Sequence, residues 1–120
     1  MGTVSEANGG VIPTWSDWRP FPDPRKGEDL TSPIGPGCYE LRHRRTDELI
    51  LFGMSSNVAA RLSSLLPKPW GCGTRSNSAK RDYVMAALAD VDYRTIATTT
   101  RLEASLIENS FDRRRYRFPS

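Results

Sequence analysis

Glu103 is a carboxylate at a position where a partner is needed. Residues 100–107 have helical periodicity, and on a helical wheel Glu103 projects between Leu106 and Ile107, inside the apolar stripe that we expect to pack on a sheet. A cation or an arginine would compensate the charge there. Thr100 offers another explanation, because Thr100–Glu103 has the spacing of a capping box, in which the carboxylate accepts from the backbone N–H of Thr100. The sequence leaves both interpretations open.

Arg61 belongs to a helix that is predicted to be capped by Ser55 or Ser56 and to end at Leu66, before Pro67. It lies at the border of the apolar stripe of that helix, which consists of Val58, Leu62, Leu65 and Leu66. From there its guanidinium could hold a phosphate oxygen and offset charge in a transition state. A surface arginine whose stem covers apolar neighbours would have the same sequence pattern.

Other basic residues are clustered. The chain has 17 Lys and Arg against 14 Asp and Glu, a net charge of +3 and a pI of about 9.1, which permits a nucleic-acid partner without requiring one. We expect nucleic-acid contacts from basic residues of the predicted hairpin, of a loop beside Trp70 and of the C-terminus, namely Arg42, Arg44, Arg45, Lys68, Arg75 and Arg115. Ordinary solvated surface is the alternative for these clusters.

The elements that must position these side chains follow from the hydrophobic pattern. β-Favouring residues predict strands over residues 37–42, 49–53 and 91–99, of which the first two form a hairpin across a charged loop. A helix over residues 78–89 is expected to leave Lys80 and Arg81 in solvent. With the helices that carry Arg61 and Glu103, the pattern predicts an α+β domain over residues 33–120, a three-stranded antiparallel sheet flanked by three helices.

Residues 1–32 are predicted to form an extended, proline-rich N-terminal arm whose start is disordered. Trp15, Trp18 and Phe21 are costly to leave in water, so the arm could wrap around the domain and bury these rings. Alternatively, the rings could form a stacking platform for unpaired bases.

The composition also bounds the location and the metal chemistry. Cys38 and Cys72 are the only cysteines and His43 is the only histidine, too few ligands for a disulfide framework or a structural zinc site. No apolar stretch is long enough to span a bilayer, and the first six residues lack the features of a signal peptide. We expect a cytoplasmic protein without a membrane partner, associated with the nucleoid if the source is bacterial.

Four features, taken in order along the chain, resemble the GIY-YIG nuclease family: Gly37-Cys38-Tyr39, Leu51-Phe52-Gly53, Arg61 and Leu102-Glu103-Ala104-Ser105-Leu106-Ile107. The resemblance covers about Pro33 to Phe118. It implies the same α+β fold and a metal-dependent endonuclease that hydrolyses phosphodiester bonds of DNA, with Tyr39, Arg61 and Glu103 as catalytic residues.

The resemblance also implies a role for each residue. Glu103 would hold one Mg²⁺ or Mn²⁺, with water and phosphate oxygens as the other ligands. Tyr39 would deprotonate or orient the attacking water, and Arg61 would stabilise the pentacovalent phosphate. A phenol with a pKa of about 10 is a poor base at neutral pH, so Tyr39 would need the nearby cation to acidify it. Otherwise Tyr39 is a core aromatic of its strand.

Four residues depart from the pattern of the family. Leu51 stands where a second tyrosine is usual, Met54 where a lysine or another polar residue is common, Leu65 where a histidine or tyrosine often lies, and Arg117 where asparagine is usual. The first hypothesis is therefore an endonuclease that acts on DNA, including single-stranded or branched DNA, with help from a second copy or a partner protein. The second is a catalytically degenerate domain that binds nucleic acid or a protein, with Glu103 in a salt bridge to an arginine.

Overall fold

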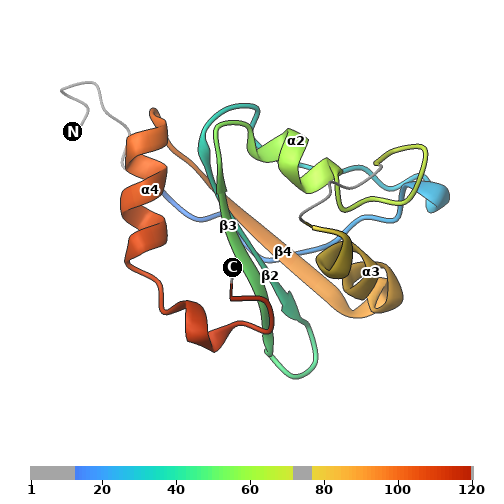
Figure 1. Cartoon of the computed structure of the whole chain (residues 1–120). Coiled ribbons are helices and arrows are strands. Elements are labelled where there is room, and N and C mark those ends of the chain that lie inside the picture. Colours follow the sequence, from blue (N-terminus) through green and yellow to red (C-terminus); the bar gives the residue numbers. More distant parts are fainter. Residues whose placement is uncertain (1–12, 72–76, 120) are drawn as a thin grey trace.

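The core of the molecule is an antiparallel sheet of four strands in the order β1-β4-β2-β3 (Figure 1). The computed structural model describes residues 13–71 and 77–119. β2 spans Gly37–His43, β3 spans Leu49–Ser55 and β4 spans Val91–Ala97. These are the three strands that the β-favouring residues predict, and β2 lies between the other two. The α+β class is confirmed.

The sheet has one strand more than the sequence predicts. β1 is the two-residue strand Arg19–Pro20 of the N-terminal arm, and it pairs with β4. Two backbone bonds of 2.8 Å hold the arm on either side of it, from Ser16 N to Thr95 O and from Phe21 N to Val91 O. A strand this short has no periodicity that a sequence pattern could reveal. The prediction of a three-stranded sheet is therefore wrong.

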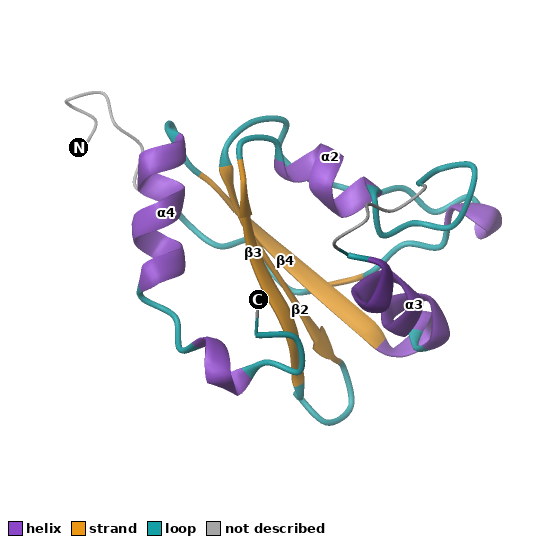
Figure 2. Ribbon diagram, viewed as in Figure 1, coloured by secondary structure: helices purple, strands orange, loops and turns teal. Residues whose placement is uncertain are grey.

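The α-helices cover both faces of the sheet (Figure 2). α2 spans Val58–Ser63, α3 spans Ser78–Ala86 and α4 spans Arg101–Asn109. In the view of Figure 1, α2 and α3 lie on one side of the sheet and α4 lies on the other. Three short 3-10 helices complete the described elements, η1 at Pro24–Lys26, η2 at Leu88–Asp90 and η3 at Arg113–Arg115.

Alternation along β2 assigns its side chains to the two faces, because successive residues of a strand point to opposite sides. Tyr39 and Leu41 belong to the larger core cluster, which also contains Val58 and Leu62 of α2. Cys38 belongs to a second cluster with Ala104 of α4. We refer to the two sides as the α2/α3 face and the α4 face.

The helix that carries Arg61 has the predicted core residues but different ends. Its N-cap is Asn57, whose side chain accepts from Ala60 N at 3.1 Å, and its last residue is Ser63. Asn57 caps this helix in place of the predicted Ser55 or Ser56, because the Ser55 hydroxyl bonds to Asn57 instead. The predicted stripe is confirmed as buried, at Val58, Leu62, Leu65 and Leu66.

α4 turns a different side toward the sheet than its helical wheel predicts. Ala104 is fully buried, whereas 63% of Leu106 is exposed. Cys38 donates through its thiol to the carbonyl oxygen of Ala104 at 3.3 Å, so this turn of the helix lies close to β2. Burial and the negative charge of Glu108 raise the pKa of the Cys38 thiol to about 12, so it is protonated and able to donate. The expected position of Leu106 in the buried stripe is wrong.

The arm packs on the domain, as one of the two interpretations of its aromatic residues predicts. Phe21 is 3% exposed and meets Tyr93 edge to face, at 5.5 Å between ring centroids. The Trp15 ring lies against the Arg94 guanidinium at 4.4 Å, and the Trp18 ring lies against the same group at 4.7 Å. The two tryptophans therefore enclose an arginine of the sheet, which stabilises the arm through cation–π contacts.

Candidate functional site

Tyr39 lies across the neighbouring strand at a glycine. Tyr39 of β2 pairs with Gly53 of β3, and a Cβ atom added to Gly53 would overlap the ring and the hydroxyl of Tyr39. Residue 53 therefore has to lack a side chain for the phenol to occupy this place. Tyr39 is 7% exposed, so most of its ring is in the core and its hydroxyl lies over β3.

Gly37 brings α2 down onto the same face. A Cβ atom at Gly37 would overlap the carbonyl oxygen of Ile96 and would come within 3.2 Å of Val58 Cγ2. Val58 is the first residue of α2, and its backbone N–H donates to the carbonyl oxygen of Gly35 at 2.9 Å. The glycine and tyrosine of the first triplet thus have different tasks. Gly37 permits close approach of the helix, and Tyr39 occupies the space over Gly53.

Arg61 of α2 lies near enough to Tyr39 for its charge to act on the phenol. Burial raises the pKa of Tyr39, and the Arg61 guanidinium opposes that rise through its charge and a side-chain hydrogen bond. The net shift is upward, so the phenol keeps its proton at neutral pH. Arg61 itself is exposed. The pair therefore consists of a buried, neutral hydroxyl and a solvated cation at the edge of the core.

Lys80 of α3 lies near the same pair, which the sequence did not indicate. Its side chain is half-buried instead of lying in solvent, and both burial and the positive charge of Arg61 lower its pKa. The expectation for Arg81 is also wrong, since its guanidinium donates to the carbonyl oxygens of Leu66 and Gly71. The helical wheel of one helix does not show which of its charged residues will contact a second helix.

Glu103 serves as part of a helix cap. Its backbone N–H donates to the Thr100 hydroxyl at 3.1 Å, which is one half of the predicted capping box. Its carboxylate atom Oε1 accepts from the backbone N–H of Thr99 at 2.8 Å and from the Thr99 hydroxyl. The bonds from the hydroxyl and then from the backbone lower the pKa of Glu103. Among the described residues, no arginine forms an ion pair with it.

The structure brings Tyr39 and Arg61 together, whereas Glu103 stays apart from them. α4 packs on the face opposite to Tyr39, and within residues 13–71 and 77–119 Glu103 contacts neither residue of the pair. All three share one end of the sheet, however. Gly37 at the start of β2 pairs with Ser55 and Ala97, and α2 and α4 begin shortly after those two strand ends.

The basic residues that were expected to contact nucleic acid differ in their surroundings. Arg42 and Arg44 both pair with Asp92, and Arg45 pairs with Asp90 at 2.9 Å. Lys68 and Arg115 are exposed and have no carboxylate partner in the described part of the chain, and Arg75 lies outside it. The hairpin arginines therefore form ion pairs within the fold, and an external anion would have to compete with these aspartates for them.

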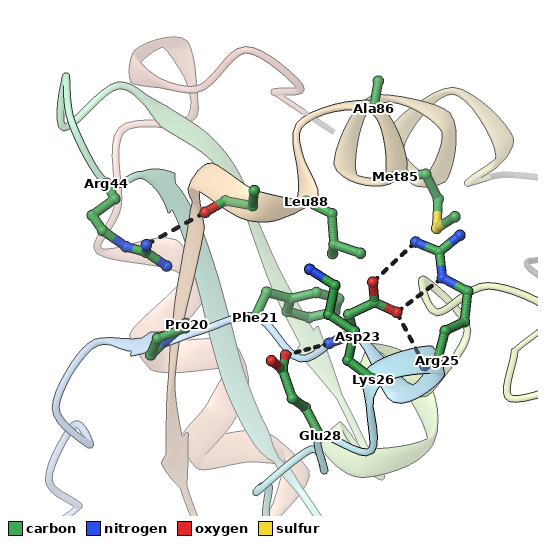
Figure 3. A pocket seen from close by; sticks show the side chains of 11 residues that line it. Pro20, Phe21, Asp23, Arg25, Lys26, Glu28, Arg44, Met85, Ala86 and Leu88 are labelled. Carbon is green, nitrogen blue, oxygen red and sulfur yellow. Dashed lines mark hydrogen bonds and ion pairs between the residues drawn. The ribbon is translucent and has the colours of Figure 1, made fainter.

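Two pockets of about 490 Å³ each lie away from the Tyr39–Arg61 pair. One lies between the arm and α3, and Figure 3 shows that its charged rim is largely satisfied by internal bonds, such as those from Arg25 to Asp23. The other lies beside the hairpin, where His43 meets the Tyr83 hydroxyl and Arg117 pairs with Glu48 at 3.1 Å. In neither pocket do the described residues place unpaired polar groups around a side chain that could act in catalysis.

Comparison with known proteins adds no relative. No protein-family model matches the chain, and neither the curated proteins nor the solved structures that were searched include a match. In the part that the structure describes, no group of three or more His, Cys, Asp and Glu side chains is placed to hold a metal ion. The described helices are all too short or too polar to cross a membrane.

Proposed function

We propose that this protein is a metal-dependent endonuclease that hydrolyses phosphodiester bonds of DNA. The observation that carries the proposal is the place of the Tyr39 hydroxyl over Gly53, where the charge of Arg61 acts on it. A neutral phenol and a fork of guanidinium donors, placed at the border between core and solvent, suit the binding of a phosphodiester and a water molecule. The two glycines at which these close approaches occur, Gly37 and Gly53, belong to the triplets on which the resemblance to GIY-YIG nucleases rests.

In this proposal each residue of the pair has a defined task. Arg61 binds non-bridging phosphate oxygens and offsets the charge that develops on them. Tyr39 orients the attacking water through its hydroxyl. Because burial raises the pKa of Tyr39, the phenol acts as a hydrogen-bonding group and does not remove a proton by itself at neutral pH.

Glu103 is the residue that would hold Mg²⁺ or Mn²⁺. Within the described chain, hydrogen bonds engage only its Oε1 atom, and Oε2 remains for a cation. One carboxylate with water and phosphate oxygens is a donor set that Mg²⁺ accepts, whereas zinc needs more protein ligands. When bound, the cation would supply positive charge at the end of the sheet that Glu103 shares with Tyr39 and Arg61. A cytoplasmic enzyme that acts on DNA, with a second copy or a partner protein that adds specificity, completes the proposal.

Two observations favour a second candidate, a domain that binds DNA or a protein without cleavage. The Glu103 carboxylate is already used by the cap of its own helix. Leu51, at the position where a second tyrosine would be expected, is 2% exposed and part of the apolar core. Both features are compatible with phosphate binding at Arg61 and unfavourable for metal chemistry.

Cleavage of labelled single-stranded, duplex and branched DNA with Mg²⁺ or Mn²⁺ tests the proposal. We expect the wild type to cut at least one substrate, and Arg61→Ala and Glu103→Gln to lose the activity while remaining folded. Thr100→Ala is the matched control for Glu103, because it removes the other half of the same cap and leaves the carboxylate. Loss of activity in Glu103→Gln but not in Thr100→Ala assigns Glu103 to the chemistry.

Failure takes a different form for each candidate. If the wild type binds DNA and no metal supports cleavage, the endonuclease is excluded and the binding domain is the better account. If Glu103→Gln and Thr100→Ala lose activity equally, and in proportion to their loss of stability, Glu103 is only a cap.

A further inference from the structure

The charges of most arginines in this molecule are neutralised internally. Eight arginines form ion pairs with carboxylates: Arg25, Arg42, Arg44, Arg45, Arg94, Arg113, Arg114 and Arg117. Arg61 and Lys80 have no such partner among residues 13–71 and 77–119. They also lie close enough for the charge of Arg61 to act on Lys80. Two cations therefore lie near each other without a carboxylate partner in the described residues.

The contacts between α2 and α3 fix the two cations on the same side. Asn77 donates through its side-chain amide to the Ser64 hydroxyl at 2.9 Å, and Ser64 in turn donates to the carbonyl oxygen of Arg61 at 2.6 Å. Arg61 lies three residues before Ser64, and Lys80 lies three residues after Asn77. Residues at this spacing share a helix face. The bond between Ser64 and Asn77 thus aligns the turn of Arg61 with the turn of Lys80.

Arg81 makes this alignment rigid. Its guanidinium donates to the carbonyl oxygen of Leu66, which follows α2, at 3.0 and 3.2 Å, and to that of Gly71 at 3.2 Å. Lys80 is the adjacent residue of α3, so its backbone position relative to α2 is set by these bonds.

The electrostatic state of Lys80 agrees with this arrangement. Burial lowers its pKa first and the like charge of Arg61 lowers it further, so both effects disfavour the ammonium form. An anion between the two groups would reverse the second effect. The Tyr39 hydroxyl, on which the charge of Arg61 acts, would lie beside that anion and could donate to it.

We propose that Arg61 and Lys80 together bind one backbone phosphate of DNA beside the Tyr39 hydroxyl. The inference rests on the proposed function, since it takes a phosphodiester as the substrate, and it adds Lys80 as a binding residue. Arg61 contributes the planar fork that fits two phosphate oxygens, and Lys80 contributes a point charge from the second helix. The phosphate would then be fixed from both helices of the α2/α3 face.

DNA binding in EDTA, measured by fluorescence anisotropy over a series of salt concentrations, tests this inference. The probes are labelled single-stranded and duplex oligonucleotides without a defined target sequence. We expect Lys80→Gln to weaken binding about tenfold at low salt and to reduce the slope of log K against log[salt] by about 0.7 to 0.9, the loss of one phosphate contact. Lys80→Arg should restore most of both.

Lys26→Gln is the matched control, because Lys26 is an exposed lysine of η1. It should leave the affinity and the slope unchanged. Equal effects of Lys80→Gln and Lys26→Gln overturn the inference, because they reduce the role of Lys80 to net charge. A wild type that binds neither probe overturns the inference together with the proposed function.

Cleavage assays with the same variants separate the inference from the proposed function. If the wild type cuts DNA and Lys80→Gln binds and cuts equally well, the phosphate subsite is wrong and the endonuclease stands. If binding depends on Lys80 but nothing is cut with Mg²⁺ or Mn²⁺, the subsite stands and the endonuclease is wrong.

A titration of the wild type with inorganic phosphate tests the subsite without depending on whether a variant folds. Addition of phosphate should shift the NMR signals of the Lys80 side chain. The signals of Lys26, an exposed lysine, should shift less. The same Lys80 signals should not respond in Arg61→Gln. A Lys80 signal that does not respond to phosphate in the wild type contradicts the subsite.

Discussion

The two faces of the sheet differ in how their buried and exposed charges are arranged. On the α4 face, Glu40 is 2% exposed and pairs with Arg94 at 2.6 Å, and its other carboxylate oxygen accepts from the Tyr116 hydroxyl. Asp92 of β4 on the same face is equally enclosed and pairs with two arginines. On the α2/α3 face, Arg61 and Lys80 meet without a carboxylate in the described part of the chain.

The difference indicates which charges serve the fold. A carboxylate removed from water needs a partner, so the pairs of the α4 face are conditions for folding. Arg61 keeps its head in water and needs no partner for stability. Arg61 and Lys80 have no carboxylate partner in the described residues, which is why the proposed phosphate subsite lies on the α2/α3 face.

The strongest test of this comparison removes the buried charge. Glu40→Gln should lower the free energy of unfolding by about 3 kcal/mol, because it leaves the Arg94 cation in a largely enclosed place without its counter-charge. Chemical denaturation measures the change. Glu48→Gln is the control, since Glu48 also pairs with an arginine but is 42% exposed, and it should cost less than about 1 kcal/mol. If both variants lose the same free energy of unfolding, burial does not decide how much an ion pair contributes to the fold.

The second test fills the space over β3. Gly53→Ala should cost about 2 kcal/mol, because the new methyl group overlaps the ring and hydroxyl of Tyr39 and forces a shift in a packed core. Denaturation of Gly53→Ala, of Tyr39→Leu and of the double variant gives the coupling between them. We expect the double variant to be more stable than the sum of the single changes predicts. Additive costs would mean that the glycine does not serve the tyrosine.

The sequence contained more information on these two faces than the pattern analysis used. The three main strands and helices were predictable because their periodicity is strong. The register was also present in the order of charges. Glu40-Leu41-Arg42 and Asp92-Tyr93-Arg94 are complementary when they run antiparallel, and the structure pairs Glu40 with Arg94 and Arg42 with Asp92. If these residues are interpreted as cross-strand pairs, Arg42 is predicted to form an ion pair within the sheet and not to contact nucleic acid.

Other features could not be predicted, for physical reasons. β1 forms because the arm is held by its tryptophans and Phe21, and two residues have no period of their own. The proximity of Tyr39 and Arg61 follows from the expected hairpin and helix. Lys80 lies near them because Asn77 bonds to Ser64 and Arg81 bonds to Leu66, and these bonds depend on tertiary packing. Glu103 was ambiguous because a cap and a metal ligand require the same residue at the same place.

A third test concerns the Thr100 cap at the start of α4. Thr100→Ala should destabilise the protein by about 1 kcal/mol, because the Glu103 N–H loses the hydroxyl that it donates to. Thermal or chemical unfolding measures the change. An unchanged free energy of unfolding would contradict the role of the Thr100 hydroxyl in the cap.

A smaller effect should appear in acid. The hydrogen bonds from Thr99 lower the pKa of Glu103 in the folded protein, so the folded state binds fewer protons than the unfolded state between the two pKa values. The resulting stability is present above the ordinary glutamate pKa of about 4.3 and is lost as the pH falls through the lower folded value. Unfolding of Thr99→Val should therefore depend less on pH below about 5 than that of the wild type. An unchanged pH dependence would contradict the role of Thr99.

The smallest effect on stability is expected from Arg61, and it sharpens the comparison most. Arg61→Gln should change the free energy of unfolding by less than about 0.5 kcal/mol, because the guanidinium is exposed and no carboxylate depends on it. The pKa of Tyr39 should nevertheless rise, since Arg61 opposes the effect of burial on that group. NMR titration of ring-labelled tyrosine follows the shift, with Tyr39→Phe to assign the signal. A large loss of stability would place Arg61 with the structural pairs of the α4 face, whereas a shifted Tyr39 pKa in a protein of unchanged stability is the behaviour of a site kept free for an anion.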